Sequence, residues 1–223
     1  MSVLVVKHHE EDSAGLVGEA LSRRGASLRE LLVPGPRPFP DPGAYERIVV
    51  LGAKWSVYDT ATVGAFLDDE LAFLRRADGA GVPVLGICFG AQLLCAAFDG
   101  EVEPSPRLEL GWQDVEPLEK SPLEAGPWFQ FHKDRCVLSD RARPLAVNDV
   151  CVQAFSIGAH VGVQFHPEVD GRELEAWYRA GCRDDVSAAG IDPEALLDET
   201  RRNEKDARRR ADRLVATVVG DLS

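Results

Sequence analysis

The chain is short of positive charge. Its 223 residues carry 25 lysines and arginines against 37 aspartates and glutamates, a formal net charge of −12. An acidic surface repels phosphate backbones and anionic lipid headgroups, so nucleic-acid and membrane-surface partners are not expected. No apolar run approaches the roughly 18 residues of a membrane span, and no positive region precedes the apolar start Val3–Val6, which argues against a signal peptide. We therefore expect a cytoplasmic protein.

Paired cysteine motifs are also missing. The five cysteines are odd in number, and none of them has the CxxC spacing of zinc and redox motifs. We expect reduced thiols and no zinc site.

The first hundred residues alternate apolar strands with helical patterns. Strands are expected at Val3–Val6, Leu28–Val33, Arg47–Gly52 and Val82–Ile87, and helices near Ala14–Arg24, Leu67–Arg76 and Ala91–Phe98. This order is typical of an α/β fold, in which a mostly parallel sheet has helices on both faces.

The second half of the chain has a different pattern. Short strands at close spacing predict a small antiparallel extension of the sheet: Trp112–Leu118, Cys136–Leu138, Leu145–Val147, Val150–Phe155 and His160–Gln164. From Gly171 onward the pattern is helical, and Asp192-Pro193 fits a helix start. We expect one domain over residues 1–180 and a helical extension over 181–223 that packs on it; a partner interface is the alternative use of the extension's apolar stripe.

The stretch GICFGAQLL, residues 86–94, places Cys88 between two glycines, after an apolar strand and before a helix. This is the layout of a nucleophile elbow, in which the neighbours of a strained residue lack side chains so that strand and helix approach closely. A thiol at a helix N-terminus is favoured as the thiolate, and the N–H of Phe89 could stabilise an oxyanion. The alternative is that Cys88 is a small buried apolar residue.

A base and its orienting group occur together in QFHPE, residues 164–168. Residues two apart on an extended chain point the same way, so Glu168 can accept a proton from one ring nitrogen of His166. The other ring nitrogen is then free to face the thiol. A plain surface turn is the alternative for this motif alone.

GICFGAQLL together with QFHPE resembles the class I (triad) glutamine amidotransferase family, and most of all stand-alone relatives of the glutaminase domain of GMP synthetase. The resemblance implies a flavodoxin-like fold and a triad of Cys88, His166 and Glu168. It also implies that glutamine is hydrolysed through a γ-glutamyl thioester, that Gln92 helps to hold the substrate, and that no metal or organic cofactor is needed.

Other segments resemble the family less closely. The family's glycine pair at the oxyanion hole corresponds to Gly52 and Ala53, and Ala53 would be strained if its backbone needed a positive φ. Phe131–Asp134 resembles a substrate segment with Lys133 in place of glycine, which makes His132 either a pocket residue or a surface histidine. Gly111 and Trp112 resemble a segment at the pocket edge.

The family usually delivers ammonia to a synthetase, and this sequence has no phosphate-binding glycine loop after the triad. We therefore expect either a separate synthetase subunit as partner or a hydrolase that acts alone on glutamine or another γ-glutamyl small molecule. Two other classes stay open. One is a cysteine α/β-hydrolase of the dienelactone type, against which Glu168 argues, and the other is a non-catalytic regulatory module that keeps the fold.

Overall fold

The fold is built on one nine-stranded sheet, seen here in a computed structural model that describes residues 1–36 and 38–219. The strand order is β2-β1-β3-β4-β9-β8-β7-β5-β6. The first five of these strands are parallel and the remaining four extend the sheet in antiparallel fashion. When β9 is counted as the fifth parallel strand, the parallel part has the 2-1-3-4-5 order of flavodoxin-like folds, as the sequence predicts.

The strands are β1 (Ser2–Lys7), β2 (Ser27–Leu32), β3 (Arg47–Val50), β4 (Val84–Ile87), β5 (Glu101–Pro117), β6 (Gly126–Val137), β7 (Arg143–Val147), β8 (Val152–Ile157) and β9 (His160–Val163). The α-helices are α1 (Gly15–Arg23), α2 (Thr60–Val63), α3 (Leu67–Gly79), α4 (Phe89–Ala97), α5 (Gly171–Trp177), α6 (Arg183–Ala188) and α7 (Pro193–Val219). A 3-10 turn spans Pro42–Ala44, and a wider helical segment, Tyr178–Cys182, joins α5 to α6.

Helices cover both faces of the parallel strands because successive strand residues point to opposite sides. On β1, Leu4 and Val6 belong to the core cluster that also holds Phe73 of α3, whereas Val3 and Val5 lie in the cluster of α1 and α7. Strands buried on both faces read as continuous apolar runs, which is why the sequence pattern locates them well.

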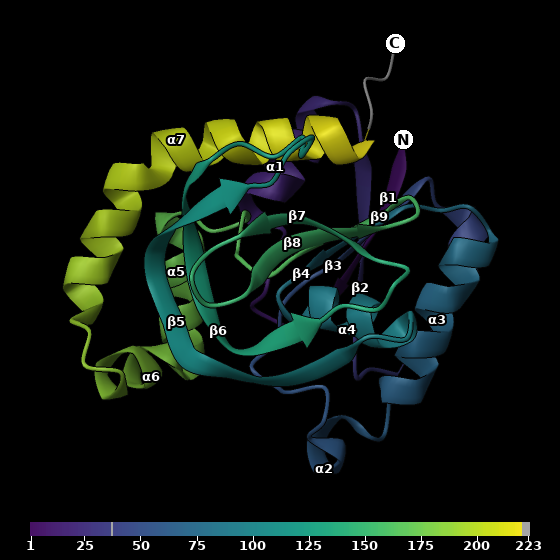
Figure 1. The fold of residues 1–223 in the computed structure, drawn as a ribbon, viewed down its shortest axis with the longest axis horizontal. Coiled ribbons are helices and arrows are strands. Elements are labelled where there is room, and N and C mark those ends of the chain that lie inside the picture. Colours follow the sequence, from purple (N-terminus) through teal and green to yellow (C-terminus); the bar gives the residue numbers. More distant parts are fainter. Residues whose placement is uncertain (37, 220–223) are drawn as a thin grey trace.

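The antiparallel extension is larger than expected. β5 and β6 form one long hairpin that begins at Glu101, where we expect strands only from Trp112 and Cys136. Much of β5 is exposed on both faces and contains Pro104 and Pro106, so its sequence lacks the apolar alternation of a half-buried strand. Figure 1 shows this hairpin curving around the far end of the sheet.

The last helix, α7, lies along α1 and continues toward α6 (Figure 1). It begins where expected, because the Asp192 carboxylate accepts a hydrogen bond from the backbone N–H of Glu194. Its apolar stripe contributes Leu214 and Val215 to the core beside α1; the side chain of Val219, at the end of the predicted stripe, lies outside the described residues. Among the described residues, no helix combines the length and apolar character that crossing a membrane requires.

Candidate active site

Cys88 occupies a strained turn between β4 and α4. Its φ of 50° and ψ of −105° are unusual for a residue with a side chain. The turn is fixed from both sides, since the backbone N–H of Cys88 donates to the Val163 carbonyl of β9 and its carbonyl accepts from Gln92 of α4. The thiol therefore sits at the carboxyl end of a central strand, where open α/β sheets bind ligands.

The glycines around Cys88 are required by close backbone approaches. A Cβ on Gly90 would lie 2.2 Å from the Val50 carbonyl oxygen, and a Cβ on Gly86 would lie 2.5 Å from the Gly90 carbonyl oxygen. Both distances are far inside van der Waals contact, so α4 packs against β3 and β4 only because these side chains are missing.

His166 and Glu168 form a buried pair beside the thiol. Nδ1 of His166 lies 2.7 Å from Oε1 of Glu168, and the His166 backbone N–H donates to the Phe129 carbonyl. The other ring nitrogen, Nε2, is buried and makes no hydrogen bond to the described residues. The structure thus places the Glu168 carboxylate on one ring nitrogen and leaves the other toward the cavity side, the arrangement expected for a base oriented by a carboxylate.

Electrostatics favour the charged form of the His166 ring. Burial acts to lower the pKa of His166, but the Glu168 carboxylate and the Cys88 thiol outweigh it and raise that pKa well above its ordinary value. An imidazolium is therefore stable next to the thiol, which is the form needed to protonate a leaving amine.

Gly52 packs directly against His166 and Cys88. A Cβ on Gly52 would be 3.0 Å from Cε1 of His166 and 3.5 Å from the Cβ of Cys88. Ala53 shows no strain, because the described non-glycine residues with positive φ are Cys88, Asp99 and Lys120. The family's second glycine is thus replaced here without a left-handed backbone.

Gln92 and His132 also line the cavity around Cys88. The Gln92 side-chain amide donates to Gln164, 3.4 Å away, and its own oxygen is buried without a hydrogen-bond donor among the described residues. His132 is buried, so it is a pocket residue rather than a surface histidine.

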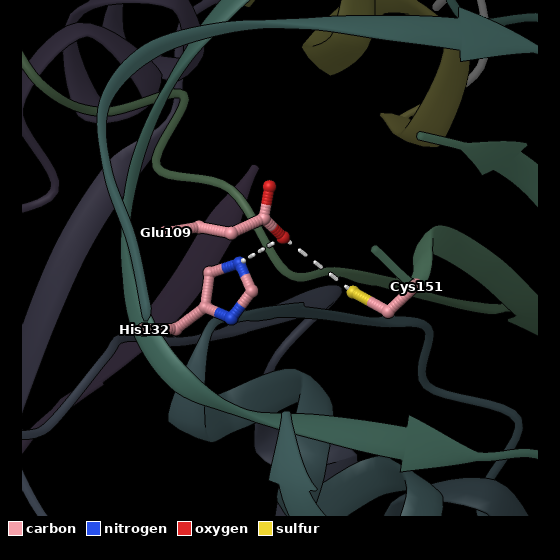
Figure 2. Close-up of side chains that lie close together, drawn as sticks. All are labelled: Glu109, His132 and Cys151. Atoms are coloured by element: carbon pink, nitrogen blue, oxygen red, sulfur yellow. Dashed lines mark hydrogen bonds and ion pairs between the residues drawn. The ribbon is translucent and has the colours of Figure 1, made fainter. Parts of the chain in front are cut away.

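Figure 2 shows how His132 is held. In the figure its Nε2 faces Glu109, whose Oε2 lies 3.2 Å away. Outside the figure, its Nδ1 donates to the Asp134 carbonyl. Burial acts to raise the pKa of Glu109, yet hydrogen bonds from His132, Asn148 and Gln153 hold it below its ordinary value. Glu109 is therefore a buried carboxylate that fixes the ring of His132.

Cys151 completes the one described group of three side chains whose spacing could hold a metal ion, with Glu109 and His132. The Cys151 thiol lies 3.7 Å from Oε2 of Glu109 (Figure 2), and burial followed by the charge of Glu109 raises the pKa of Cys151 to about 12. The protonated thiol thus acts as a hydrogen-bond donor, and the cluster is already satisfied as a polar network.

The structure places Gly111 and Trp112 away from the residues that line the cavity. Gly111 faces Leu196 of α7, and the Trp112 indole donates to the Thr200 hydroxyl of the same helix. Both residues lie under α7, which covers that face of β5. This contact joins distant segments of the chain, so the local motif around Gly111 does not predict it.

The cavity has a volume of about 520 Å³. Cys88, His166 and Glu168 line it, and one wall comes from α5 and the segment beyond it, through Trp177, Ala180, Cys182, Asp185 and Ala188. The Trp177 ring packs edge-on against His166, with 5.0 Å between ring centroids. Sequence reasoning missed this wall, because its residues belong to a helical stretch without a chemical motif.

A second missed feature is the carboxyl group of Glu173. It is buried beside Ser13, whose hydroxyl donates to it, and the Trp177 indole also donates to it. Burial is the main reason that the pKa of Glu173 rises to about 7, and the nearby charge of Glu168 adds to the effect. A titratable acid thus lies next to the triad glutamate.

The sequence of the chain is similar to known proteins. The model of the family "Glutamine amidotransferase class-I" matches residues 37–181. Glutamine-hydrolysing GMP synthases of Brucella melitensis biotype 1 and Brucella ovis are each 36% identical over 111 residues. These matches cover 43% of this chain but only 22% and 21% of the two relatives. The matched part is therefore about a fifth of the length of these relatives.

Solved structures resemble the chain over almost its whole length. A glutamine amidotransferase from Thermotoga maritima has a TM-score of 0.89 and 27% identity, with 99% of each chain covered. A glutamine amidotransferase from Methylobacillus flagellatus has a TM-score of 0.86 and covers 100% of this chain and 95% of its own, but at 22% identity it supports the fold alone.

Proposed function

We propose that this chain, which belongs to the class-I glutamine amidotransferase family of enzymes acting on amide C–N bonds, hydrolyses the γ-amide of glutamine through a thioester on Cys88. The observation that carries this proposal is the meeting of Cys88, His166 and Glu168 in one cavity. The buried Nε2 of His166, which the described residues leave without a hydrogen bond other than any to the adjacent Cys88 thiol, supports it.

The first half of the reaction forms the acyl-enzyme. The Cys88 thiolate attacks the γ-carbonyl carbon, and the oxygen of the tetrahedral intermediate receives hydrogen bonds from the backbone N–H groups of Phe89 and Ala53. Phe89 is the first residue of α4, so its N–H has no partner within the helix. Nε2 of His166 then protonates the departing nitrogen, and the C–N bond breaks. Ammonia departs, and a γ-glutamyl thioester remains on Cys88.

The second half releases the product. Nε2 of His166, now neutral, takes a proton from water as the water oxygen attacks the thioester carbon. The C–S bond breaks, glutamate departs, and the thiolate–imidazolium pair is restored. Glu168 accepts the Nδ1 hydrogen bond throughout and stabilises the charged ring.

The cavity volume favours a second candidate, a longer γ-glutamyl conjugate that the chain hydrolyses alone. About 520 Å³ lies within the roughly 300–1,000 Å³ range of pockets that bury drug-sized ligands, and glutamine is a much smaller molecule. For the first candidate, a separate synthetase is the proposed acceptor of the nitrogen. This chain matches about a fifth of the length of the glutamine-hydrolysing GMP synthases.

The deciding experiment measures ammonia release from L-glutamine by the purified chain, with Cys88→Ala as control. Release that disappears in the control supports a self-sufficient glutaminase. No release, with Cys88 still alkylated selectively by a glutamine-like electrophile, would move the proposal to a partner-dependent enzyme or another γ-glutamyl substrate. No release from an inert Cys88 would leave the regulatory module as the explanation.

A further inference from the structure

A buried histidine–glutamate pair borders the cavity, because His8 is one of the residues that line it. His8 follows β1, and Glu70 sits in the first turn of α3. Nε2 of His8 lies 3.2 and 3.3 Å from the two carboxylate oxygens of Glu70. The Glu70 side chain is 0% exposed, and within the described residues it makes no other hydrogen bond. Burying a polar pair costs free energy of desolvation that apolar residues would not, so the stability of the fold alone does not account for it.

The second ring nitrogen of His8 connects the pair to the active site. Nδ1 lies 3.1 Å from the carbonyl oxygen of Gly52. A carbonyl oxygen can only accept, so Nδ1 carries a proton and donates it. Nε2 faces both oxygens of the Glu70 carboxylate. His8 is thereby fixed at both nitrogens, by a helix on one side and by the peptide after β3 on the other.

The hydrogen bond to Gly52 determines where the next N–H points. In a planar trans peptide the C=O of Gly52 and the N–H of Ala53 point in opposite directions. Holding the carbonyl toward His8 therefore turns the Ala53 N–H away from His8. Gly52 itself packs against Cys88 and His166, so this peptide borders the position where the oxyanion forms.

His8 also contacts the residue that supplies the other oxyanion donor. Its ring packs edge-on against the Phe89 ring, with 5.0 Å between centroids, and similarly against Trp55 at 5.9 Å. One imidazole thus touches both Phe89 and the Gly52–Ala53 peptide, which lie on different segments of the chain.

The geometry points to His8, held by Glu70, as a positioning residue that orients the Ala53 N–H of the oxyanion hole. This inference rests on the proposed function. It also explains how an alanine replaces the family's glycine: the peptide is oriented by a hydrogen bond from outside rather than by a left-handed backbone.

The test compares His8→Leu with His8→Asn. Leucine removes the donor to Gly52, whereas the asparagine side-chain amide can place an N–H near the position of Nδ1. We expect His8→Leu to lower kcat for glutamine hydrolysis about 100-fold, the effect of losing one oxyanion donor, with little change in KM. His8→Asn should recover most of the turnover. Alkylation of Cys88 by iodoacetamide, which forms no oxyanion, should change less than about threefold in both variants.

His160→Leu is the matched control, because it shows how much turnover falls when the loss of a buried histidine only destabilises the fold. His160 is another buried histidine that faces a carboxylate, Asp78 at 3.2 Å, and it lies outside the cavity lining. This variant should lose thermal stability but keep its turnover per folded molecule. Equal losses of turnover in His8→Leu and His160→Leu, or a His8→Asn variant as slow as His8→Leu, would overturn the positioning role.

A second readout separates this inference from the proposed function. If the wild-type chain releases no ammonia from glutamine, the proposed function fails, and the NMR signals of the Gly52 carbonyl carbon and the Ala53 amide test the positioning directly. We expect both signals to move in His8→Leu and to stay close to wild type in His8→Asn. Unmoved signals in His8→Leu would refute the contact.

Discussion

Nδ1 of His166 lies 2.7 Å from Oε1 of Glu168, with only Pro167 between the two residues in the chain. The proposed base and its orienting carboxylate therefore come from a single short segment after β9. The thiol of Cys88 comes from a distant segment after β4, and the parallel pairing of β4 with β9 brings the two together.

Cys88→Ala should abolish hydrolysis of the γ-glutamyl amide, with a loss of at least about 10⁴-fold in kcat, because the thioester cannot form. The measurement is ammonia release under saturating glutamine. Cys95→Ala is the matched control, since Cys95 is buried in the same helix outside the cavity lining, and it should keep wild-type turnover. Turnover in Cys88→Ala within tenfold of wild type would contradict the thioester route.

Glu168→Gln should change both the rate and its dependence on pH. Glu168 helps to raise the pKa of His166 above its ordinary value, so the wild-type imidazolium persists as the pH rises through that value. Removing the charge lowers this pKa, and the alkaline fall in kcat should move to lower pH. We also expect kcat to drop by about 10²- to 10⁴-fold. A profile of kcat against pH is the check, and an alkaline limb in the wild-type position would refute the assignment.

Glu173→Gln should alter how stability depends on pH. The folded protein raises the pKa of Glu173 to about 7, so it keeps a proton that the unfolded chain releases near the usual value of 4.5. Wild-type stability should therefore fall as pH rises from about 4.5 to 7. Across this pH window, the free energy of unfolding of Glu173→Gln should rise relative to that of the wild type, by at most about 3 kcal/mol.

Denaturant unfolding at several pH values measures this effect. Glu175→Gln, at a more exposed position on the same helix, is the control and should follow the wild-type pH dependence. A constant difference between Glu173→Gln and wild type at all pH values would show that Glu173 does not titrate in this range.

Gly90→Ala should destabilise the fold by about 3 kcal/mol, because its Cβ would meet the Val50 carbonyl and push α4 away from β3. Gly79→Ala is the matched substitution at the end of α3, where a Cβ meets no atom within 4 Å. It should be neutral or slightly stabilising. Thermal melts of the two variants give the comparison, and similar melting temperatures would contradict the close approach.

The sequence predicts best those parts whose determinants are local. The parallel strands are recognisable because burial on both faces makes them continuously apolar, and the elbow is recognisable because Gly86 and Gly90 cannot carry side chains. His166 and Glu168 are predicted for the same reason, since they belong to one short segment.

Other parts depend on contacts between distant segments. His8 and Glu70 meet across α3 and β1, and neither lies in a motif that suggests chemistry. Glu109 acts on His132 only because the β5–β6 hairpin pairs them in register. In the first half of β5, apolar and polar residues do not alternate, because most side chains on both faces of the strand are exposed.

The wall formed by Cys182, Asp185 and Ala188 lies beyond residue 181, where the match to the family model ends. Reaction chemistry and access to it are thus encoded by different stretches of this chain. The proposed nucleophile and base belong to the segment that matches the family, whereas part of the cavity lining belongs to the residues after it. Substitutions at Cys182, Asp185 or Ala188 would therefore reshape the cavity without touching the residues proposed to carry the reaction.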